Sequence, residues 1–171
     1  MKTILHIIDT TGPGGAETVF IDLATQLPKE RYRSVIVIRD KGWVFDELCR
    51  RGFTPILLDA KGSFNWRYLL ALHKVIKRER VDLIQSHLLG SNVDCALAGL
   101  LTRKPVITTF HGAVDISETE RFMALKFDLI NKGASRIVAV SENLRDEIAR
   151  RTPLNTNKTD VIYNGIDTVA F

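Results

Sequence analysis

The chain has 171 residues, of which 45% are hydrophobic and 26% are charged, and its formal net charge is +4. This balance is typical of a folded globular domain and excludes a disordered tail or a fibre. The charge is too small for a nucleic-acid-binding surface, and no apolar run reaches the roughly 20 residues that cross a bilayer.

Short apolar runs alternate with helical patterns along the whole chain. The runs predict strands at Ile4 to Ile8, Val35 to Ile38, Pro55 to Leu58, Asp82 to Gln85, Pro105 to Phe110, Arg136 to Val140 and Asp160 to Tyr163. The helical spacing predicts helices at Ala16 to Leu27, Trp43 to Arg51, Tyr68 to Arg80, Ser91 to Leu101, Glu118 to Asn131, and from a cap at Ser141 to about Arg150. Strand–helix repetition of this kind predicts an α/β, Rossmann-like parallel sheet with right-handed crossovers and helices on both faces.

A glycine-rich turn follows the first predicted strand. Gly12, Gly14 and Gly15 let the backbone approach a ligand closely, and the free N–H groups of the next helix favour an anion such as a diphosphate. The same turn is also compatible with a tight strand–helix connection that binds nothing. A dinucleotide site is disfavoured, because Glu17 stands where its motif has a third glycine and would repel a pyrophosphate. Asp40 fits either a ribose-binding acid or an ordinary loop residue.

A histidine and an Asn-Gly turn mark two later strand ends. His111 follows a buried strand, at the edge where parallel sheets bind ligands. Its imidazole there can hydrogen-bond a sugar hydroxyl, donate to a developing charge or take a proton, and a structural loop histidine is the alternative. Asn164 and Gly165 end the last predicted strand, and alone they indicate only a turn.

Four short motifs resemble, in order and spacing, those of the family 4 retaining glycosyltransferases: Gly14-Gly15-Ala16-Glu17, Thr109-Phe110-His111-Gly112, Val140-Ser141 and Asn164-Gly165-Ile166-Asp167. The resemblance covers essentially the whole chain. It implies the GT-B architecture, in which an N-terminal Rossmann-like domain mainly receives the acceptor and a C-terminal one holds the nucleotide sugar. We therefore expect an acceptor-side domain over residues 1–163, the start of an interdomain linker over 164–171, and no donor-binding domain, whose signature glutamate pair is absent.

The resemblance also implies the roles of individual residues. His111 would be catalytic and contact the transferred sugar, while Gly14 and Gly15 would approach the donor diphosphate. The residues expected to bind the acceptor are Glu17, Ser63, Asn65, His87, Asn92, Gly112 and Ser141. No metal or cofactor is expected beyond the nucleoside-diphosphate sugar, and the sequence has no Asp-x-Asp motif.

The resemblance further implies what the whole protein would do. It would move a sugar, with retention, to a glycan or lipid-linked acceptor, as in surface polysaccharide synthesis, and the present fragment alone would be inactive. In the family a final helix returns to pack on this domain, so we also expect self-association without it. The alternative is a non-enzymatic Rossmann-like module that binds a nucleotide or phosphate.

The cellular setting is inferred from the cysteines and from one basic helix. Cys49 and Cys95 are the two cysteines, and both lie in helical patterns, so we expect free thiols and a cytoplasmic protein. A basic cluster lies within residues 67–80 and comprises Arg67, Lys74, Lys77, Arg78 and Arg80. It is either a solvated helix face or a patch for anionic lipid headgroups at the inner face of a membrane.

Overall fold

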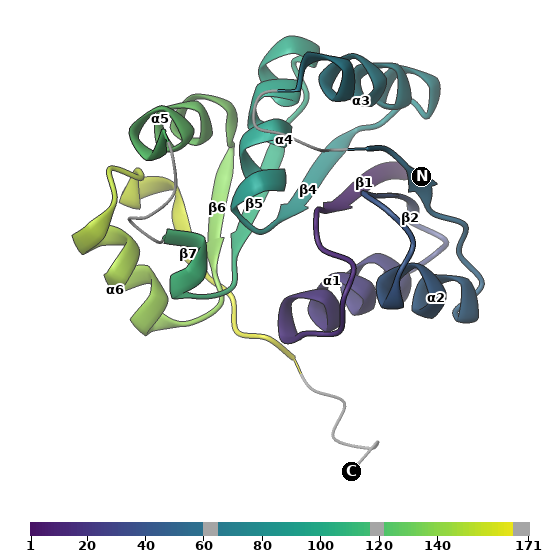
Figure 1. Ribbon diagram of the computed structural model, residues 1–171, viewed down its shortest axis with the longest axis horizontal. Helices are drawn as coiled ribbons and strands as arrows, with labels where there is room; N and C mark the ends of the chain where they lie inside the picture. Colours follow the sequence, from purple (N-terminus) through teal and green to yellow (C-terminus); the bar gives the residue numbers. More distant parts are fainter. Residues whose placement is uncertain (60–64, 117–121, 166–171) are drawn as a thin grey trace.

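The computed structural model describes residues 1–59, 65–116 and 122–165. In this part of the chain seven strands form one parallel sheet in the order β3-β2-β1-β4-β5-β6-β7 (Figure 1). The strands are β1 (Lys2–Ile8), β2 (Tyr32–Ile38), β3 (Ile56–Leu57), β4 (Leu83–His87), β5 (Val106–Phe110), β6 (Arg136–Ala139) and β7 (Thr159–Val161). The predicted α/β class and parallel sheet are therefore confirmed.

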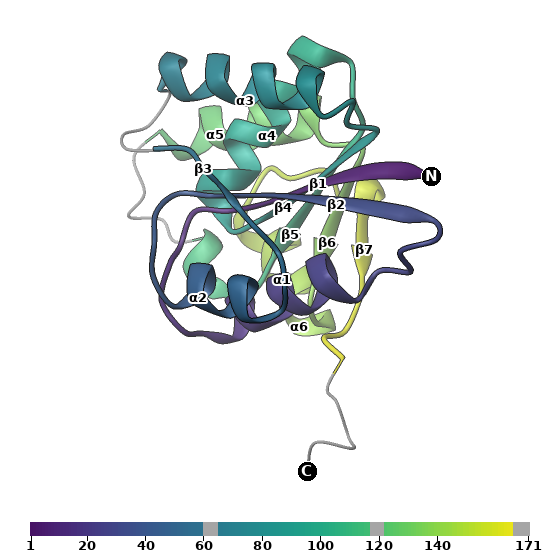
Figure 2. The same cartoon turned by 90° about the vertical axis from the view of Figure 1, so that its right-hand side faces the viewer.

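Helices cover both faces of the sheet. They are α1 (Gly15–Gln26), α2 (Trp43–Arg50), α3 (Trp66–Arg78), α4 (Leu89–Thr102), α5 (Met123–Gly133) and α6 (Glu142–Arg151), with short 3₁₀ helices η1 (Ala113–Ile116) and η2 (Thr156–Lys158). Figure 2 shows α3, α4 and α5 on one side of the strands and α1, α2 and α6 on the other. Among the residues described, no helix is long and apolar enough to cross a membrane.

The continuous apolar runs are explained by this two-sided cover. Leu5 and Ile7 of β1 pack in one cluster with α3 and α4, through residues such as Leu72. Ile8 packs in another cluster with Phe20 of α1 and residues of α2. Because successive side chains of a strand point to opposite faces, a strand buried on both faces is apolar at consecutive positions.

Some predicted boundaries are wrong. The helix expected from Glu118 begins at Met123, because Phe122 has a left-handed φ of 60°; residues 117–121 lie outside the described part. The last strand begins at Thr159 and ends at Val161 instead of Tyr163, whose side chain is 66% exposed. The third is two residues long, since β3 is an edge strand that pairs with β2 alone.

The strand order indicates which edge of the sheet is expected to bind a ligand. Successive strands are added outward from β1 on one side and from β4 on the other, so the direction changes between these two neighbours. Connections leave β1 and β4 toward opposite faces at that point, and ligands of open α/β sheets bind there, outside the carboxyl ends of the strands. The segments that follow β1, β4 and β5 therefore meet at this edge.

Candidate functional site

Two histidines meet at the carboxyl ends of β4 and β5. His87 is the last residue of β4, and its partner in the sheet register is Thr109, two residues before His111. Nδ1 of His87 lies 2.8 Å from Nε2 of His111, and the ring centroids are 5.1 Å apart at an interplanar angle of 24°. The parallel register thus converts a separation of 24 residues into a direct hydrogen bond between imidazoles.

Burial keeps both imidazoles neutral at neutral pH. The side chain of His87 is 1% exposed and meets Phe20 of α1 edge to face. Burial lowers the pKa of His87 well below 6.5, and the neighbouring His111 and His6 add to this. Burial also lowers the pKa of His111 to about 4, against the opposing effect of Glu17. Among the described residues, Nε2 of His87 and Nδ1 of His111 have no hydrogen-bond partner.

Two carboxylates hold the backbone around this pair. Asp115 accepts hydrogen bonds from the N–H of His111 at 2.7 Å and of Leu89 at 3.3 Å. Asp9, after β1, accepts from the N–H of Ser91, and it lies so close to Gly90 that a Cβ there would collide with it. Burial raises the pKa of Asp9 and of Asp115. The N-terminus of α4 is therefore occupied by carboxylates of the chain itself, and an additional anion would be repelled.

The sequence did not identify either aspartate as a site residue. Aspartates are common in turns after strands, where most of them have only a local role. Asp115 stands four residues after His111 and Asp9 immediately follows β1. Their positions after strands could have indicated a role at this edge, but these positions do not reveal that both aspartates cap the N-terminus of α4.

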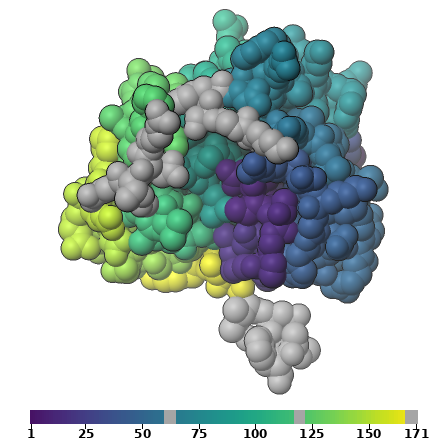
Figure 3. Space-filling view, in the orientation of Figure 1, coloured from purple at the N-terminus to yellow at the C-terminus, as the bar shows by residue number. Residues whose placement is uncertain are grey.

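The glycine turn leads into a helix start without a side-chain cap. Gly14 is the N-cap of α1 and makes no side-chain capping bond, and there is open space where a Cβ of Gly15 would lie. The carboxylate of Glu17 folds back against Gly14, where it would collide with a Cβ. The purple N-terminal segment that includes this turn reaches the molecular surface (Figure 3). A diphosphate here would meet favourable helix N–H groups and the unfavourable charge of Glu17.

Asn92 and Ser141, both expected to bind an acceptor, have hydrogen bonds within the fold. Asn92 is fully buried, where it accepts from the Ser86 hydroxyl at 2.7 Å and donates to the Thr109 carbonyl at 3.0 Å. Ser141 caps α6 by accepting from the N–H of Leu144 at 3.2 Å. Their hydrogen bonds position strands and helices around the site.

The remaining expected acceptor residues are Asn65, Gly112 and Ser63. Asn65 caps α3, accepting from the N–H of Arg67 at 3.1 Å and of Tyr68 at 3.2 Å. Gly112 follows His111 directly, and its carbonyl accepts from the N–H of Asp115 at 3.1 Å. Ser63 lies outside the described residues. Of the seven expected acceptor residues, His87, Glu17 and Gly112 therefore gather around His111.

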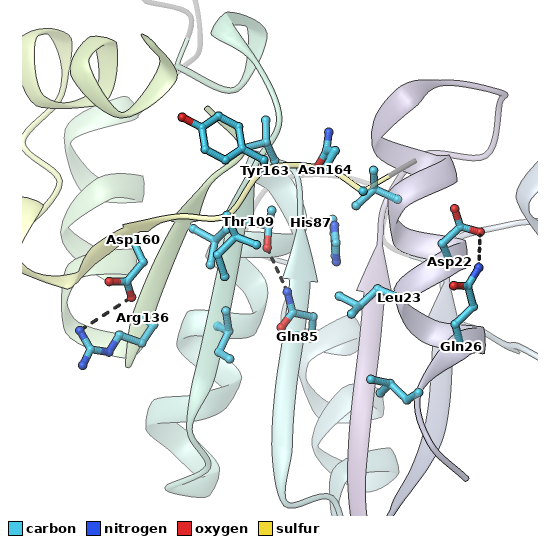
Figure 4. A pocket seen from close by; sticks show the side chains of 17 residues that line it. Asp22, Leu23, Gln26, Gln85, His87, Thr109, Arg136, Asp160, Tyr163 and Asn164 are labelled. Carbon is cyan, nitrogen blue, oxygen red and sulfur yellow. Dashed lines mark hydrogen bonds and ion pairs between the residues drawn. The ribbon is translucent and has the colours of Figure 1, made fainter. Parts of the chain in front are cut away.

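A groove of about 790 Å³ lies beside this cluster, on the sheet face that carries α1 (Figure 4). Its walls are α1 and the segment that follows β7, and its floor is formed by β4, β5 and β6. Gln85 donates to the Thr109 hydroxyl at 3.0 Å on this floor, and His87 also lines it. Of the residues that line the groove, His87 alone was expected from the sequence as a site residue, since a groove formed by several distant segments leaves no local pattern.

The apolar part of the groove includes exposed side chains. Leu23 of α1 is 36% exposed, and Ile162 and Tyr163 after β7 are 59% and 66% exposed. The polar residues at its margins are paired, Arg136 with Asp160 at 3.8 Å and Gln26 with Asp22 at 3.3 Å. A surface of this composition favours an apolar occupant.

Comparison with known proteins gives a family match and several structural neighbours. The model of Glycosyltransferase Family 4 matches residues 13–170. The chain is 22% identical over 166 residues to an Escherichia coli UDP-Gal:alpha-D-GlcNAc-diphosphoundecaprenol alpha-1,3-galactosyltransferase, and the match covers 92% of this chain and 43% of that protein. The chain therefore spans less than half the length of this relative.

Solved structures show the same fold. Anabaena HepE, crystallised with UDP and glucose, superposes with a TM-score of 0.81 at 21% identity, covering 98% of this chain and 45% of that one. A glycosyltransferase from Rickettsia africae superposes with a TM-score of 0.79 at 23% identity, covering 97% and 44%. The fold described here thus corresponds to rather less than half of these larger proteins.

Proposed function

Because residues 13–170 match its model, this chain belongs to glycosyltransferase family 4, and we propose that it is the acceptor-binding half of a retaining glycosyltransferase. The whole protein would transfer a sugar from a nucleoside-diphosphate sugar to a glycan or lipid-linked acceptor in surface polysaccharide synthesis. We propose that it uses no metal or other cofactor. Support for these substrates comes from the UDP-galactose-dependent relative, whose named acceptor is a lipid diphosphate, and from the neighbour crystallised with UDP and glucose.

One observation carries the proposal: an uncapped helix start and a neutral histidine pair meet at the switch point of the sheet. Gly14 and Gly15 provide backbone N–H groups for a diphosphate, and His111 provides an imidazole close enough for the charge of Glu17 to affect its pKa. Transfer of a sugar depends on orienting two substrates and stabilising the departing diphosphate. This half of the cleft offers groups for both tasks, with the acceptor at the strand-end edge.

The test is a titration of the ¹⁵N-labelled chain with UDP, GDP, inorganic diphosphate and NAD, followed by chemical-shift changes. We expect the first three ligands to shift Gly14, Gly15 and His111, because all three carry a diphosphate with a free terminal phosphate group, whereas the diphosphate of NAD is esterified at both ends. Glu17→Gln should strengthen this binding by removing a negative charge beside it. Asp22→Asn, on the same helix but farther from its N-terminus, is the matched control. Tight binding of NAD alone, centred on Gly12 and Asp40, would instead identify a dinucleotide site.

We also propose that the groove receives a further segment of the whole protein, as the exposed Leu23, Ile162 and Tyr163 suggest. Without that segment, copies of this chain should associate through the same surface. Light scattering at increasing concentration should show this association, and Leu23→Glu should reduce it. Leu101→Glu, at a 60% exposed position on α4 and away from the groove, is the control. Equal association of both variants would remove the groove as its cause.

Peripheral contact with a membrane is proposed for α3. Trp66 and Leu70 are 63% and 52% exposed on this helix, and they share its surface with the exposed cations Lys74, Lys77 and Arg78. Exposed apolar side chains beside cations are the composition of a helix that lies on an anionic lipid surface.

Vesicle sedimentation tests this contact. Replacement of Lys74, Lys77 and Arg78 by glutamate should abolish binding to vesicles that contain phosphatidylglycerol. The same replacement of three exposed cations elsewhere, Lys29, Arg31 and Lys41, is the control for overall charge. If both triple variants lose binding equally, net charge explains it, and α3 is not the contact surface.

A further inference from the structure

The ring of His87 is the hydrogen-bonding partner of the His111 ring in the described part of the chain. Each ring contributes one nitrogen to this contact, and between two neutral imidazoles only one of these nitrogens carries a hydrogen. Two arrangements are therefore possible. In the first, His87 donates from Nδ1, and His111 carries its own hydrogen on Nδ1. In the second, His111 donates from Nε2, and its Nδ1 is a bare acceptor. The two arrangements give His111 opposite properties toward a ligand.

The charges around the pair differ between its two outer nitrogens. Around His111 lie the carboxylates of Glu17, from α1, and Asp115, from η1. Around His87 lie the uncharged ring of Phe20 and another buried histidine, His6 of β1. A nearby negative charge stabilises a hydrogen on the nitrogen of His111, and among the described residues no carboxylate acts on the His87 ring in this way. The electrostatics therefore favour the first arrangement.

We propose that His87 is a positioning residue whose Nδ1–H donates to Nε2 of His111 and thereby fixes His111 as the tautomer with its hydrogen on Nδ1. The proposal rests on the proposed function for its meaning: His111 then acts as a hydrogen-bond donor toward an oxygen of the sugar or diphosphate. A bare Nδ1 would instead repel such an oxygen and act as a base. His87 itself, at 1% exposed, acts through His111 and not by contacting the acceptor.

The packing around the two histidines supports this role. Phe20 packs edge to face on His87 with centroids 5.5 Å apart, so the His87 ring is held from the side of α1. The backbone N–H of His111 donates to the Asp115 carboxylate at 2.7 Å, which holds this residue from η1. With both residues held in place, their ring nitrogens stay within hydrogen-bonding distance at 2.8 Å, as a bond that selects a tautomer requires.

The experiment reads the tautomer directly in the ligand-free chain. Long-range ¹H–¹⁵N correlation at neutral pH distinguishes protonated from bare ring nitrogens, and we expect His111 with Nδ1 protonated and Nε2 bare. His87→Asn places an amide nitrogen where Nδ1 stands and should preserve this tautomer. His87→Phe keeps the ring but removes the donor, and should give a tautomer mixture and raise the pKa of His111 from about 4. His6→Asn, at the other buried histidine, should change neither.

The wild-type spectrum alone can overturn the proposal, so a variant that fails to fold does not prevent the test. A proton on Nε2 of His111 would show that His111 donates to His87 and that the assigned direction is wrong. An unchanged tautomer in a folded His87→Phe variant would show that His87 does not set it. Neither result depends on ligand binding. A failure of the diphosphates to bind would count against the proposed function and leave this result intact.

Discussion

Asn92, on the first turn of α4, joins the carboxyl ends of β4 and β5 through its two amide atoms. Asn92→Ala removes the 2.7 Å bond from the Ser86 hydroxyl and the 3.0 Å bond to the Thr109 carbonyl. That carbonyl still accepts from the N–H of Leu88 at 3.2 Å, whereas the hydroxyl keeps only weaker partners, the Ile107 carbonyl at 3.5 Å and the Cys95 thiol. Two hydrogen bonds of about 1 kcal/mol each, with one poorly satisfied hydroxyl, give an expected loss of about 2–3 kcal/mol in the free energy of unfolding.

Urea denaturation followed by far-UV circular dichroism measures this loss, with an unchanged slope as evidence that stability alone has changed. Asn143→Ala is the matched control, because Asn143 is exposed on α6 and its bond to Glu147 is 3.4 Å long. We expect it to change stability by less than about 0.5 kcal/mol. The double variant Ser86→Ala, Asn92→Ala should lose less than the sum of the two single changes, since neither partner remains. Equal losses for Asn92→Ala and Asn143→Ala would refute the structural role and leave the Asn92 amide available to a ligand.

Two further predictions concern polar residues around the same edge. Burial raises the pKa of Asp94 to about 7, with the charge of Asp9 adding to it and Lys126 opposing it. Ionised Asp94 therefore lowers the free energy of unfolding above that pKa, and this cost disappears as the pH falls toward 3.8, the pKa of the side chain in the unfolded chain. Asp94→Asn should therefore raise the urea midpoint at about pH 8 but not at about pH 4. An equal gain at both values would contradict the raised pKa. Ser141→Ala should lower the free energy of unfolding by about 1 kcal/mol and Ser141→Gly by a few tenths, and equal losses would argue against the cap.

The fold and the position of the site could be predicted from the sequence because both follow from local patterns. Consecutive apolar residues such as Leu5 to Ile8 indicate strands covered on both faces, and all seven predicted strands overlap an observed one. Parallel strands place their carboxyl ends on one edge, so His87 and His111 were expected at that edge. Strand and helix ends were less accurate, as at Tyr163 and Phe122, because exposure and a left-handed φ are not encoded in apolar spacing.

The roles of the polar residues depend on contacts between distant segments, which no local pattern reveals. Asn92 and Ser141 have the residue types and positions of ligand-binding groups, but an amide or hydroxyl at a helix start also caps and cross-links the backbone. The direct contact of His87 with His111 depends on the register of β4 against β5. The groove forms where α1 and the segment after β7, which are far apart in the sequence, border a floor that includes Gln85 and Thr109.

Whether a polar atom already has a hydrogen-bond partner within the fold distinguishes structural residues from candidate ligand-binding residues at this edge. The amide of Asn92 and the hydroxyl of Ser141 are bonded to other groups of the fold, and Asp115 accepts from the backbone N–H groups of His111, Leu89 and Gly112. By contrast, Nδ1 of His111 has no partner among the described residues, and Gly14, the N-cap of α1, makes no side-chain capping bond. A buried polar atom without a partner costs stability, so a ligand that satisfies it gains that free energy on binding. Under the proposed function, we therefore expect a donor sugar and its diphosphate to bind at His111 and the start of α1.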